Sequence, residues 1–316
     1  MWDVSSDLDR GERFRDDTEW LKQAWGGGSA QVVRVTETAD LAAERDPARL
    51  TLIPATGVWS PSDHIFLGLV EQTPLFARLE PALAADQAVP LRYLNPRLDS
   101  TWADVANTAV AIVQWHLMDP RCPRCGGATE VILAGFGRWC PTCAKQHFTR
   151  SDAAIIVAIL DADDRLLLGH QTTWPAGRSS LLAGFVEAGE SLEHAVYREM
   201  AEESGIPLTD VAYFGSQPWP FPRSLMVGFF ARAATAQIDV DGIEIEEASW
   251  FDRDQVRRVL SQEAGGGWGD PVPTDVRLPG SGAPLSLPGP GTIAHRMIDS
   301  WLNGHVPDLK PGSPVG

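Results

Sequence analysis

Three glutamates, Glu199, Glu202 and Glu203, lie within five positions just before Gly205. At spacings of three and four residues they share one face of a helix, where like charges repel by about 0.2–0.5 kcal/mol per pair. The negative end of the helix dipole disfavours acids there a second time. A bound cation would offset both effects. Because the cluster holds carboxylates but no Cys or His, its chemistry favours magnesium or manganese over zinc.

The helix that must position these acids is expected over residues 191–204, with Ser191 as its N-cap and Gly205 after its end. On a helical wheel the three glutamates continue the side of Leu192 and Ala195, so an apolar face becomes acidic toward its end. Carboxylates that face the interior are unfavourable unless they are paired or bound to metal. A solvated acidic face is the alternative for such a cluster.

The residues before the helix extend the pattern. Gly184 is followed after five residues by Glu190, and after seven more by the segment REMAEESGI at 198–206. This arrangement resembles the Nudix box, the loop–helix–loop signature of hydrolases that cleave nucleoside diphosphates linked to another moiety. Hydrolysis of a pyrophosphate needs divalent ions that neutralise the phosphates and activate water, which is work for clustered carboxylates.

The resemblance implies a role for each polar residue of the box. Glu199 and Glu203 would be the principal ligands of Mg²⁺ or Mn²⁺, and Glu202 would be a further ligand or would orient water. Arg198 and Glu190 would form a pair that fixes the helix to its loop. A simple loop acid is the alternative for Glu190.

Outside the helix, the resemblance implies further parts of the metal site. Gly184 would let the backbone approach the metal, and the carbonyl of Ala183 would be a ligand. Glu244, in the segment DGIEIEE, would be an additional ligand. The catalytic base is left open among Glu202, Glu203 and Glu244.

All four cysteines lie in one window as two pairs, Cys122 with Cys125 and Cys140 with Cys143, separated by fourteen residues. Two such knuckles can place four thiolates tetrahedrally around zinc, and the two glycines after the first pair allow a tight turn. Disulfides or idle thiols are the alternatives, which the paired spacing in a cytosolic setting disfavours. Four Cys ligands leave no open position for water, so the expected zinc is structural.

A segment rich in proline and aromatic residues, SQPWPFPRS at 216–224, follows the box. Its prolines favour an edge strand or a rigid extended segment, and its two rings could stack on a base or a nicotinamide. A packed surface loop is the alternative. The segment is similar to the array that marks the NADH pyrophosphatase branch of the Nudix family, which also carries a four-Cys zinc ribbon before its catalytic domain. The resemblance implies that the dinucleotide site is lined by Gln217, Pro218, Trp219, Pro220, Phe221, Pro222, Arg223 and Ser224.

The same resemblance implies four more residues at the substrate. Phe185 would stack on a nucleotide ring, and Ala294 would lie beside the dinucleotide. Arg92 would contact the substrate, with an ordinary surface arginine as the alternative. Phe148 stands where the family commonly has a tyrosine, so the ring is kept and the hydroxyl is lost.

The sequence predicts an α+β protein with three parts: an α+β domain at 1–117, a zinc ribbon at 118–148 and a Nudix domain at 149–316. The resemblance implies that the last is an α/β/α sandwich with a mixed sheet. Strands are expected at 31–37, 49–55, 64–70, 89–94, 153–160, 165–171, 181–185, 211–217, 224–233 and 248–254. Helices are expected at 101–119, 191–204 and 291–304, and a surface loop rich in Gly and Pro at 261–291.

Acids outnumber bases 42 to 26, for a formal charge of −16. This charge argues against broad binding to nucleic acid, although a local basic cluster could still hold a small anion. The first residues lack the apolar stretch of a signal peptide, and no run approaches eighteen apolar residues, so no membrane partner is expected. A cytoplasmic location is expected, and the resemblance implies a homodimer.

The expected function is metal-dependent hydrolysis of the pyrophosphate of NADH or NAD⁺, which gives AMP and nicotinamide mononucleotide. Two or three Mg²⁺ or Mn²⁺ ions and one structural Zn²⁺ are the expected cofactors. Removal of an NAD cap from the 5′ end of RNA would use the same chemistry, and ADP-ribose is a third substrate to consider. A non-catalytic nucleotide-binding module is the alternative from another class, which the intact set of glutamates disfavours.

Overall fold

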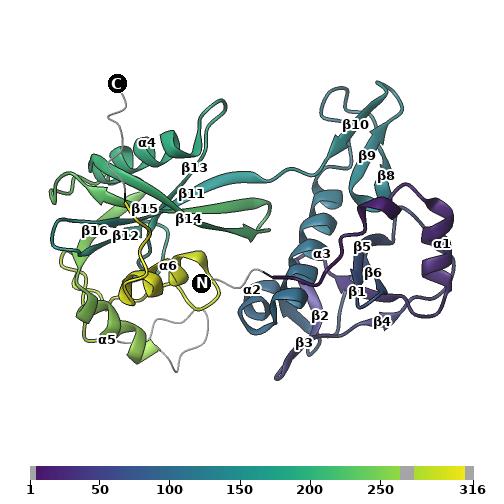
Figure 1. Ribbon diagram of the computed structural model, residues 1–316, viewed down its shortest axis with the longest axis horizontal. Coiled ribbons are helices and arrows are strands. Elements are labelled where there is room, and N and C mark those ends of the chain that lie inside the picture. Colours follow the sequence, from purple (N-terminus) through teal and green to yellow (C-terminus); the bar gives the residue numbers. More distant parts are fainter. Residues whose placement is uncertain (1–4, 264–273, 310–316) are drawn as a thin grey trace. The chain divides into compact units, whose positions relative to one another are not determined.

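The computed structural model describes residues 5–263 and 274–309 (Figure 1). The chain divides into two compact units. The first comprises Met1–Ser151 together with Trp219–Arg223, and the second comprises Asp152–Pro218 and Ser224–Gly316. In the described part of the chain, no helix has the length and apolar character needed to cross a membrane.

The first unit is built on a mixed seven-stranded sheet with the order β3-β2-β1-β6-β5, in which β4 pairs with β1 and β7 with β2. Its strands are β1 (Gln31–Val35), β2 (Asp40–Arg45), β3 (Ala48–Leu50), β4 (Ile53–Pro54), β5 (Ile65–Val70), β6 (Thr73–Leu79) and β7 (Ala88–Pro90). The central pair, β1 and β6, is parallel. Because the other pairs are antiparallel, the sheet is mixed. Hydrophobic clusters cover both faces of its central strands.

Alternate residues of β1 send their side chains to opposite faces, as the period of a strand requires. Val33 and Val35 pack with helix α3 (Ser100–Met118) in one hydrophobic cluster. Val32 packs with Leu21 and Trp25 of α1 (Thr18–Gly26) in another. An aspartate side chain caps each helix, because Asp17 accepts from the amide of Trp20 and Asp99 from that of Trp102.

A three-stranded ribbon with the order β10-β9-β8 follows α3. Its strands are β8 (Glu130–Ile132), β9 (Gly137–Cys140) and β10 (Lys145–Phe148). His116 of α3 joins the helix to the ribbon, since its Nε2 lies 2.8 Å from the carbonyl of Gly135 and its Nδ1 lies 2.7 Å from Nη1 of Arg138. Because the guanidinium donates to Nδ1, the proton of the neutral ring is on Nε2 and is donated to the carbonyl.

The second unit contains a mixed six-stranded sheet with the order β14-β15-β11-β12-β16, and β13 pairs with β11. Its strands are β11 (Asp152–Leu160), β12 (Leu166–Gln171), β13 (Leu182–Phe185), β14 (Leu208–Trp219), β15 (Ser224–Ala233) and β16 (Ile245–Phe251). β11 is parallel to β15 and antiparallel to β13. The segment with the prolines ends β14, which lies at the edge of the sheet as a strand containing proline should.

Helices cover both faces of this sheet (Figure 1). On one face α4 (Leu192–Ser204) packs Ala195, Val196 and Met200 against the core beside β11. On the other, α6 (Ile293–Leu302) contacts β15 and β11. A Cβ on Gly228 of β15 would lie 2.8 Å from Met297 Sδ, so the glycine allows this close approach. The second unit is thus an α/β/α sandwich, and α5 (Arg253–Glu263) follows β16.

Two expectations from the sequence were wrong in part. Residues 89–94 are a strand only up to Pro90, after which Leu91–Leu94 form helix α2, because Leu91 and Leu94 are buried three residues apart, at a helical spacing. A short 3₁₀ turn, Asn95–Arg97, continues it, and two others lie at Glu12–Phe14 and Leu133–Gly135.

The expected surface loop at 261–291 is also different where it is described. Helix α5 continues to Glu263, and residues 264–273 lie outside the described residues. Val276, Leu278 and Leu285 are buried. The glycines and prolines predicted the irregular backbone, but the apolar side chains between them bury themselves against the unit.

Candidate active site

Helix α4 begins and ends at the residues that its sequence predicts. The Ser191 hydroxyl accepts from the amide of His194 at 3.1 Å, and Gly205 takes the left-handed conformation, with φ 65°, that ends the helix. Burial of its apolar side, Ala195 and Met200, fixes which face turns inward. The acidic continuation of that face is therefore held in a defined position at the end of the helix.

Arg198 clamps the helix to the preceding loop. Its Nε and Nη2 donate to the two carboxylate oxygens of Glu190 at 2.9 and 2.8 Å, and Nη2 also donates to the carbonyl of Phe185 at 3.0 Å. Glu190 accepts a further bond from the amide of Glu187. The guanidinium, and next the amide, lower the pKa of Glu190 to about 2. Glu190 is therefore a paired structural carboxylate and not a solvated loop acid.

The same arginine reaches two glutamates of the cluster. Its Nη1 lies 3.0 Å from Glu199 Oε1 and 3.0 Å from Glu202 Oε2. Glu199 is largely buried, with 12% of its side chain exposed, whereas Glu202 is 61% exposed. Burial raises the pKa of Glu199, although Arg198 opposes the shift. Glu202 thus faces solvent, and Glu199 lies toward the interior.

Gly184 lies directly against the carboxylate of Glu199. A Cβ built on Gly184 would overlap the Cδ and both oxygens of that carboxylate. The residue pairs with Ile155 in the β13–β11 ladder, so its backbone cannot retreat without breaking the sheet. The glycine is required here for close approach of the side chain.

Glu203 is the most unusual residue of the cluster. Its side chain is 2% exposed, and both of its carboxylate oxygens are buried without a hydrogen-bond partner. Burial, and next repulsion from Glu199, Glu244 and Asp241, raise its pKa to about 8. The ionised form of a buried carboxylate without a hydrogen-bond partner is unfavourable, and a bound cation would stabilise it.

Glu244 approaches the cluster from the loop before β16. Asp241 organises this loop, because its carboxylate accepts from the amides of Ile243, Glu244 and Ile245 at 3.0–3.2 Å. These bonds lower the pKa of Asp241, the amide of Ile245 contributing most. Asp241 is not among the residues expected at the site, although the Asp-Gly turn just before Glu244 is a signal that marks it.

The donor set fits a hard divalent cation. It contains the carboxylates of Glu199, Glu203 and Glu244, with the carbonyl of Ala183, on β13 beside Gly184, as the further candidate. Oxygen donors without nitrogen or sulfur suit Mg²⁺ or Mn²⁺. These oxygens are not gathered as tightly as the cysteines: across residues 5–263 and 274–309, the four thiols form the group whose donor atoms all lie within 4.8 Å.

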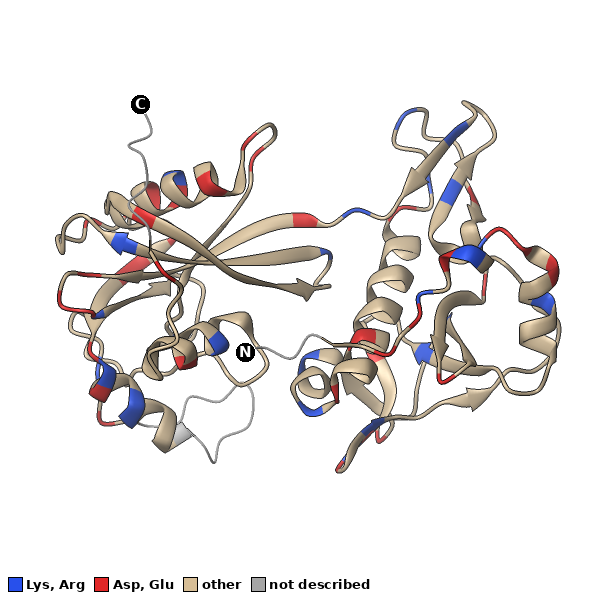
Figure 2. Cartoon of the chain, in the orientation of Figure 1, with Lys and Arg blue, Asp and Glu red and all other residues tan. Residues whose placement is uncertain are grey.

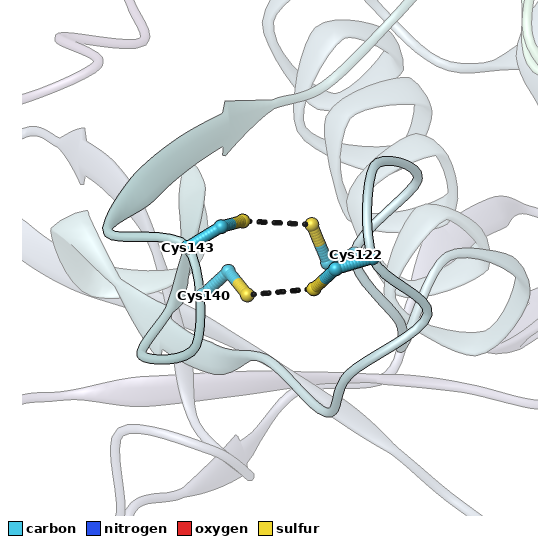
Figure 3. Close-up of side chains that lie close together, drawn as sticks. Cys122, Cys140 and Cys143 are labelled. Atoms are coloured by element: carbon cyan, nitrogen blue, oxygen red, sulfur yellow. Dashed lines mark hydrogen bonds between the residues drawn. The ribbon is translucent and has the colours of Figure 1, made fainter.

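The four cysteines come together as the spacing predicts (Figure 3). Cys122 Sγ lies 3.5 Å from Cys143 Sγ, and Cys125 Sγ lies 3.5 Å from Cys140 Sγ. All four are free thiols, and these separations are far longer than a disulfide. Tetrahedral zinc with bonds of about 2.3 Å requires sulfur separations of about 3.8 Å, close to those found. The set fits one zinc ion.

The thiols are also electrostatically coupled. The amide of Cys143 and the neighbouring thiols lower the pKa of Cys140 to about 6, whereas the side chains of Cys140 and Cys122 raise the pKa of Cys143 to about 12. Four thiolates at this separation need a cation to coexist. The glycine turn is also present, since Gly126 has φ +71°.

Within the first unit, the aromatic residues of the proline-rich segment form a packed group. The rings of Trp219 and Phe221 meet edge to face at 5.3 Å, and the guanidinium of Arg92 lies 5.4 and 4.5 Å from their centroids. Arg223 Nη1 lies 3.3 Å from Asp119. The structure thus joins Arg92, for which the resemblance implies a substrate contact, to this array.

The side chain of Gln217 bonds to the backbone at the start of α6. It is buried, its Nε2 donates to the carbonyl of Gly291 at 2.6 Å, and its Oε1 accepts from the amide of Ile293 at 2.6 Å. Both polar atoms therefore hold the start of α6. Ala294 of the same helix is also buried, at 5% exposure.

The remaining candidates differ in exposure. Phe185 and Phe148 are exposed aromatic rings, at 61% and 55%. Pro220 is buried. Pro218 and Pro222 are exposed, and Ser224 is partly exposed. The two exposed rings are the residues of this set that are open to stacking.

Comparisons with known proteins identify the family of the chain. The NUDIX domain family matches residues 149–268. The chain is 38% identical to the NAD-capped RNA hydrolase NudC of Mycobacterium bovis (strain BCG / Pasteur 1173P2) over 301 residues, which cover 93% of this chain and 92% of that protein. It is 37% identical to the NAD-capped RNA hydrolase NUDT12 of Homo sapiens over 209 residues, which cover 63% of this chain and 42% of that one. A solved NUDIX hydrolase from Nitrosomonas europaea is 20% identical, with a TM-score of 0.36, over 46% of this chain and 93% of that chain.

Proposed function

Because the chain belongs to the Nudix hydrolases, in the branch of the NAD-capped RNA hydrolases NudC, we propose that it hydrolyses the pyrophosphate of NADH and NAD⁺ to AMP and nicotinamide mononucleotide. The observation that carries the proposal is Glu203, a buried carboxylate without a partner beside Glu199 and Glu244. A merely structural helix end would gain stability from losing that charge.

In the proposed reaction a water oxygen forms a bond to one phosphorus, and the bond from that phosphorus to the bridging oxygen breaks. The bridging oxygen leaves with the other mononucleotide. When bound, divalent ions supply neutralisation of the pyrophosphate and lower the pKa of water. Glu199, Glu203 and Glu244, with the Ala183 carbonyl, are the proposed ligands, and Gly184 gives Glu199 its place against the backbone.

The proton of the attacking water passes to a carboxylate of the cluster. Glu202, Glu203 and Glu244 are the candidates for this base. Arg198 acts as a positioning residue, since it holds Glu190, Glu199 and Glu202 together. A comparison of the pH–rate profiles of the three Gln variants assigns the base, because its loss removes the acidic limb of the profile.

We assign a structural role to the expected zinc, at Cys122, Cys125, Cys140 and Cys143. We assign substrate contacts to Phe185, Phe148, Arg92 and the exposed part of the array at 218–224, and a positioning role to Gln217. A division into parts at 1–117, 118–148 and 149–316, a homodimer and a cytoplasmic location complete the proposal. Sedimentation of the zinc-loaded protein tests the dimer.

The relatives' names favour a second substrate, NAD-capped RNA, cleaved by the same chemistry. The deciding experiment measures kcat/KM side by side for NADH, NAD⁺, ADP-ribose and NAD-capped RNA with Mg²⁺ and with Mn²⁺. Preference for an intact nicotinamide dinucleotide, free or as a cap, supports the proposal. Preference for ADP-ribose would contradict it, and absence of AMP from every substrate would favour a non-catalytic binding module.

A further inference from the structure

A pocket of about 520 Å³ lies within the first unit. Its volume is in the range of small-ligand sites and exceeds what a single phosphate needs. It is lined by Trp115, Asp119, Arg121, Pro123, Thr129, Arg138, Gln146, His147, Phe148, Thr149, Arg150 and Arg223. The end of α3, the ribbon and the segment after β10 therefore form one concave surface.

The charge of this lining is opposite to that of the chain. Four arginines and one aspartate line the pocket, while the chain as a whole carries −16. Figure 2 shows Lys and Arg on the ribbon and on the segment that leads into β11, and Asp and Glu on α4 and the loop before it. Among the described residues, no carboxylate lies within ion-pair distance of Arg121, Arg138 or Arg150. A concentrated positive lining attracts anions.

Arg138 is the least expected of these cations, because it is only 9% exposed. Its guanidinium bonds to neutral groups, namely the hydroxyl and carbonyl of Thr129 at 2.6 and 3.0 Å and His116 Nδ1 at 2.7 Å. Asp119 of the same lining attracts Arg138 through space, but its carboxylate is already paired with Arg223. A buried cation whose hydrogen-bond partners are neutral is therefore only partly compensated, which is unfavourable unless a further anion binds. The pocket beside it offers such an anion a place.

Two other lining groups suit a nucleotide more than inorganic phosphate. The ring of Phe148 is 55% exposed and available for stacking on a base. Nε2 of His147 is buried without a hydrogen-bond partner and could donate to, or accept from, a ligand. Cations, an open ring and an unmet polar atom together match a phosphate, a base and a sugar hydroxyl.

We propose that this pocket is a subsite for a ribonucleotide of the RNA chain that follows an NAD cap. The inference rests on the proposed function and extends it from the dinucleotide to the RNA. Phe148 and Arg223 are also proposed contacts of the dinucleotide, whereas Arg121, Arg138 and Arg150 are not, so these three cations are surplus to the needs of free NADH. Each further phosphate of RNA gives such a lining a partner.

The first test measures binding without catalysis. The probe is a fluorescent, uncapped, 5′-phosphorylated oligoribonucleotide of about ten nucleotides, titrated into zinc-loaded protein without Mg²⁺ or Mn²⁺. Arg121→Ala and Arg150→Ala are each expected to weaken binding about three- to tenfold and to reduce the dependence of log K on log salt by about one. Arg124→Ala is the matched control, since Arg124 is exposed on the same knuckle but does not line the pocket.

The second test compares kcat/KM for NAD-capped RNA and for NADH in the same variants. A loss of about three- to tenfold for the capped RNA, through KM, with NADH unchanged within about twofold, supports the subsite. Equal losses for both substrates, or weakening by Arg124→Ala as large as by the pocket variants, would overturn it. If wild-type protein cleaves neither substrate, the proposed function fails, and the binding experiment still decides the pocket.

A free mononucleotide has the same chemistry as a ribonucleotide in a chain. Competition of AMP and ATP against the labelled oligonucleotide shows whether the pocket binds free nucleotides or RNA. Displacement only at nucleotide concentrations far above the oligonucleotide Kd supports the RNA subsite. Displacement by ATP as tight as binding of the oligonucleotide would show a free-nucleotide site and overturn the assignment to RNA.

Discussion

At the scale of single residues, the site depends on how two side chains are placed in the interior. Glu203 is buried without a partner, and Glu199 lies where only a glycine leaves room for it. Neither arrangement improves the stability of the metal-free protein. Each is understandable if the carboxylates hold divalent ions.

Glu203→Gln keeps the shape of the side chain and removes its charge. We expect kcat for NADH at saturating Mg²⁺ to fall about 10²–10³-fold, the loss typical of a removed charge-stabilising group. The folded-state pKa of about 8 exceeds the unfolded value, so the stability that Glu203 contributes without divalent ions is complete below about pH 4.5 and is lost as pH rises through 8. Urea unfolding in Mg²⁺-free buffer at pH 8.5 should therefore show the variant more stable than wild type by roughly 1–4 kcal/mol.

The matched control for this prediction is Glu193→Gln, at an exposed acid in the first turn of the same helix. It should change kcat less than about twofold. Near wild-type turnover of Glu203→Gln at saturating Mg²⁺ would show that Glu203 is not a principal ligand.

Gly184→Ala tests the close approach to Glu199. The added methyl overlaps the carboxylate, so we expect a loss of about 1–3 kcal/mol in the free energy of unfolding, and loss of most activity. Adding Glu199→Ala to Gly184→Ala should restore much of the stability, because the overlapping atoms are gone, but none of the activity. Additive destabilisation in this double-mutant cycle would mean that the two residues do not meet.

At the scale of elements, α4 was predictable because its caps, its apolar face and its acidic end all point to the same helix. α3 was also predicted within one residue at each end, since its apolar spacing is long and regular. For Leu91–Leu94 the sequence predicts a strand and the structure has a helix, because a short apolar run has no visible period. The sequence did not indicate α1, whose stability comes from Trp25 and Leu21 packing on the sheet.

The cysteines and glutamates were found because their types and spacing carry chemistry. The roles of Gln217 and Arg138 could not be read in the same way. Gln217 bonds to residues 291 and 293, and Arg138 to residues 116 and 129, so both depend on contacts that only the fold creates. The pocket could not be predicted from the sequence for the same reason, since its arginines are far apart in the chain and no segment is strongly basic.

The junction of α3 with the ribbon gives a pH prediction. Burial lowers the pKa of His116 to about 4, below the ordinary 6.5, and the charge of Arg138 adds to the effect. The unfolded chain therefore binds more protons between these values, so the contribution is complete above pH 6.5 and falls by up to about 3 kcal/mol as pH drops toward 4. His116→Gln should be less stable than wild type at pH 7.5, and the difference should shrink as pH falls.

Urea unfolding of both proteins at pH 7.5, 6.5 and 5.5 with zinc supplied measures this difference. Zinc release affects both proteins alike and cancels in the comparison. His305→Gln, at an exposed histidine, is the control and should show no such trend. A constant difference across the pH range would mean that His116 is not held neutral by its surroundings.

At the scale of the whole molecule, the two compact units carry the two expected metal sites separately. The thiols belong to the first unit and the carboxylate cluster to the second, and each unit has hydrophobic clusters of its own. Binding energy at a structural zinc site is folding energy for the unit that contains it. Divalent ions at the carboxylates stabilise the other unit by mass action.

Cys122→Ser should therefore destabilise the first unit and leave the chemistry of the second unit unchanged. Three thiolates hold zinc more weakly, so we expect zinc content and the thermal stability of the first unit to fall together, by several degrees in Tm. Calorimetry should show the loss in one transition, while added Mn²⁺ raises the other in variant and wild type alike. The protein that remains folded should keep its dependence on Mg²⁺ or Mn²⁺ in NADH hydrolysis. Full zinc occupancy with an unchanged melting profile would contradict the four-Cys site, and active protein that contains no zinc would favour idle thiols at these four positions.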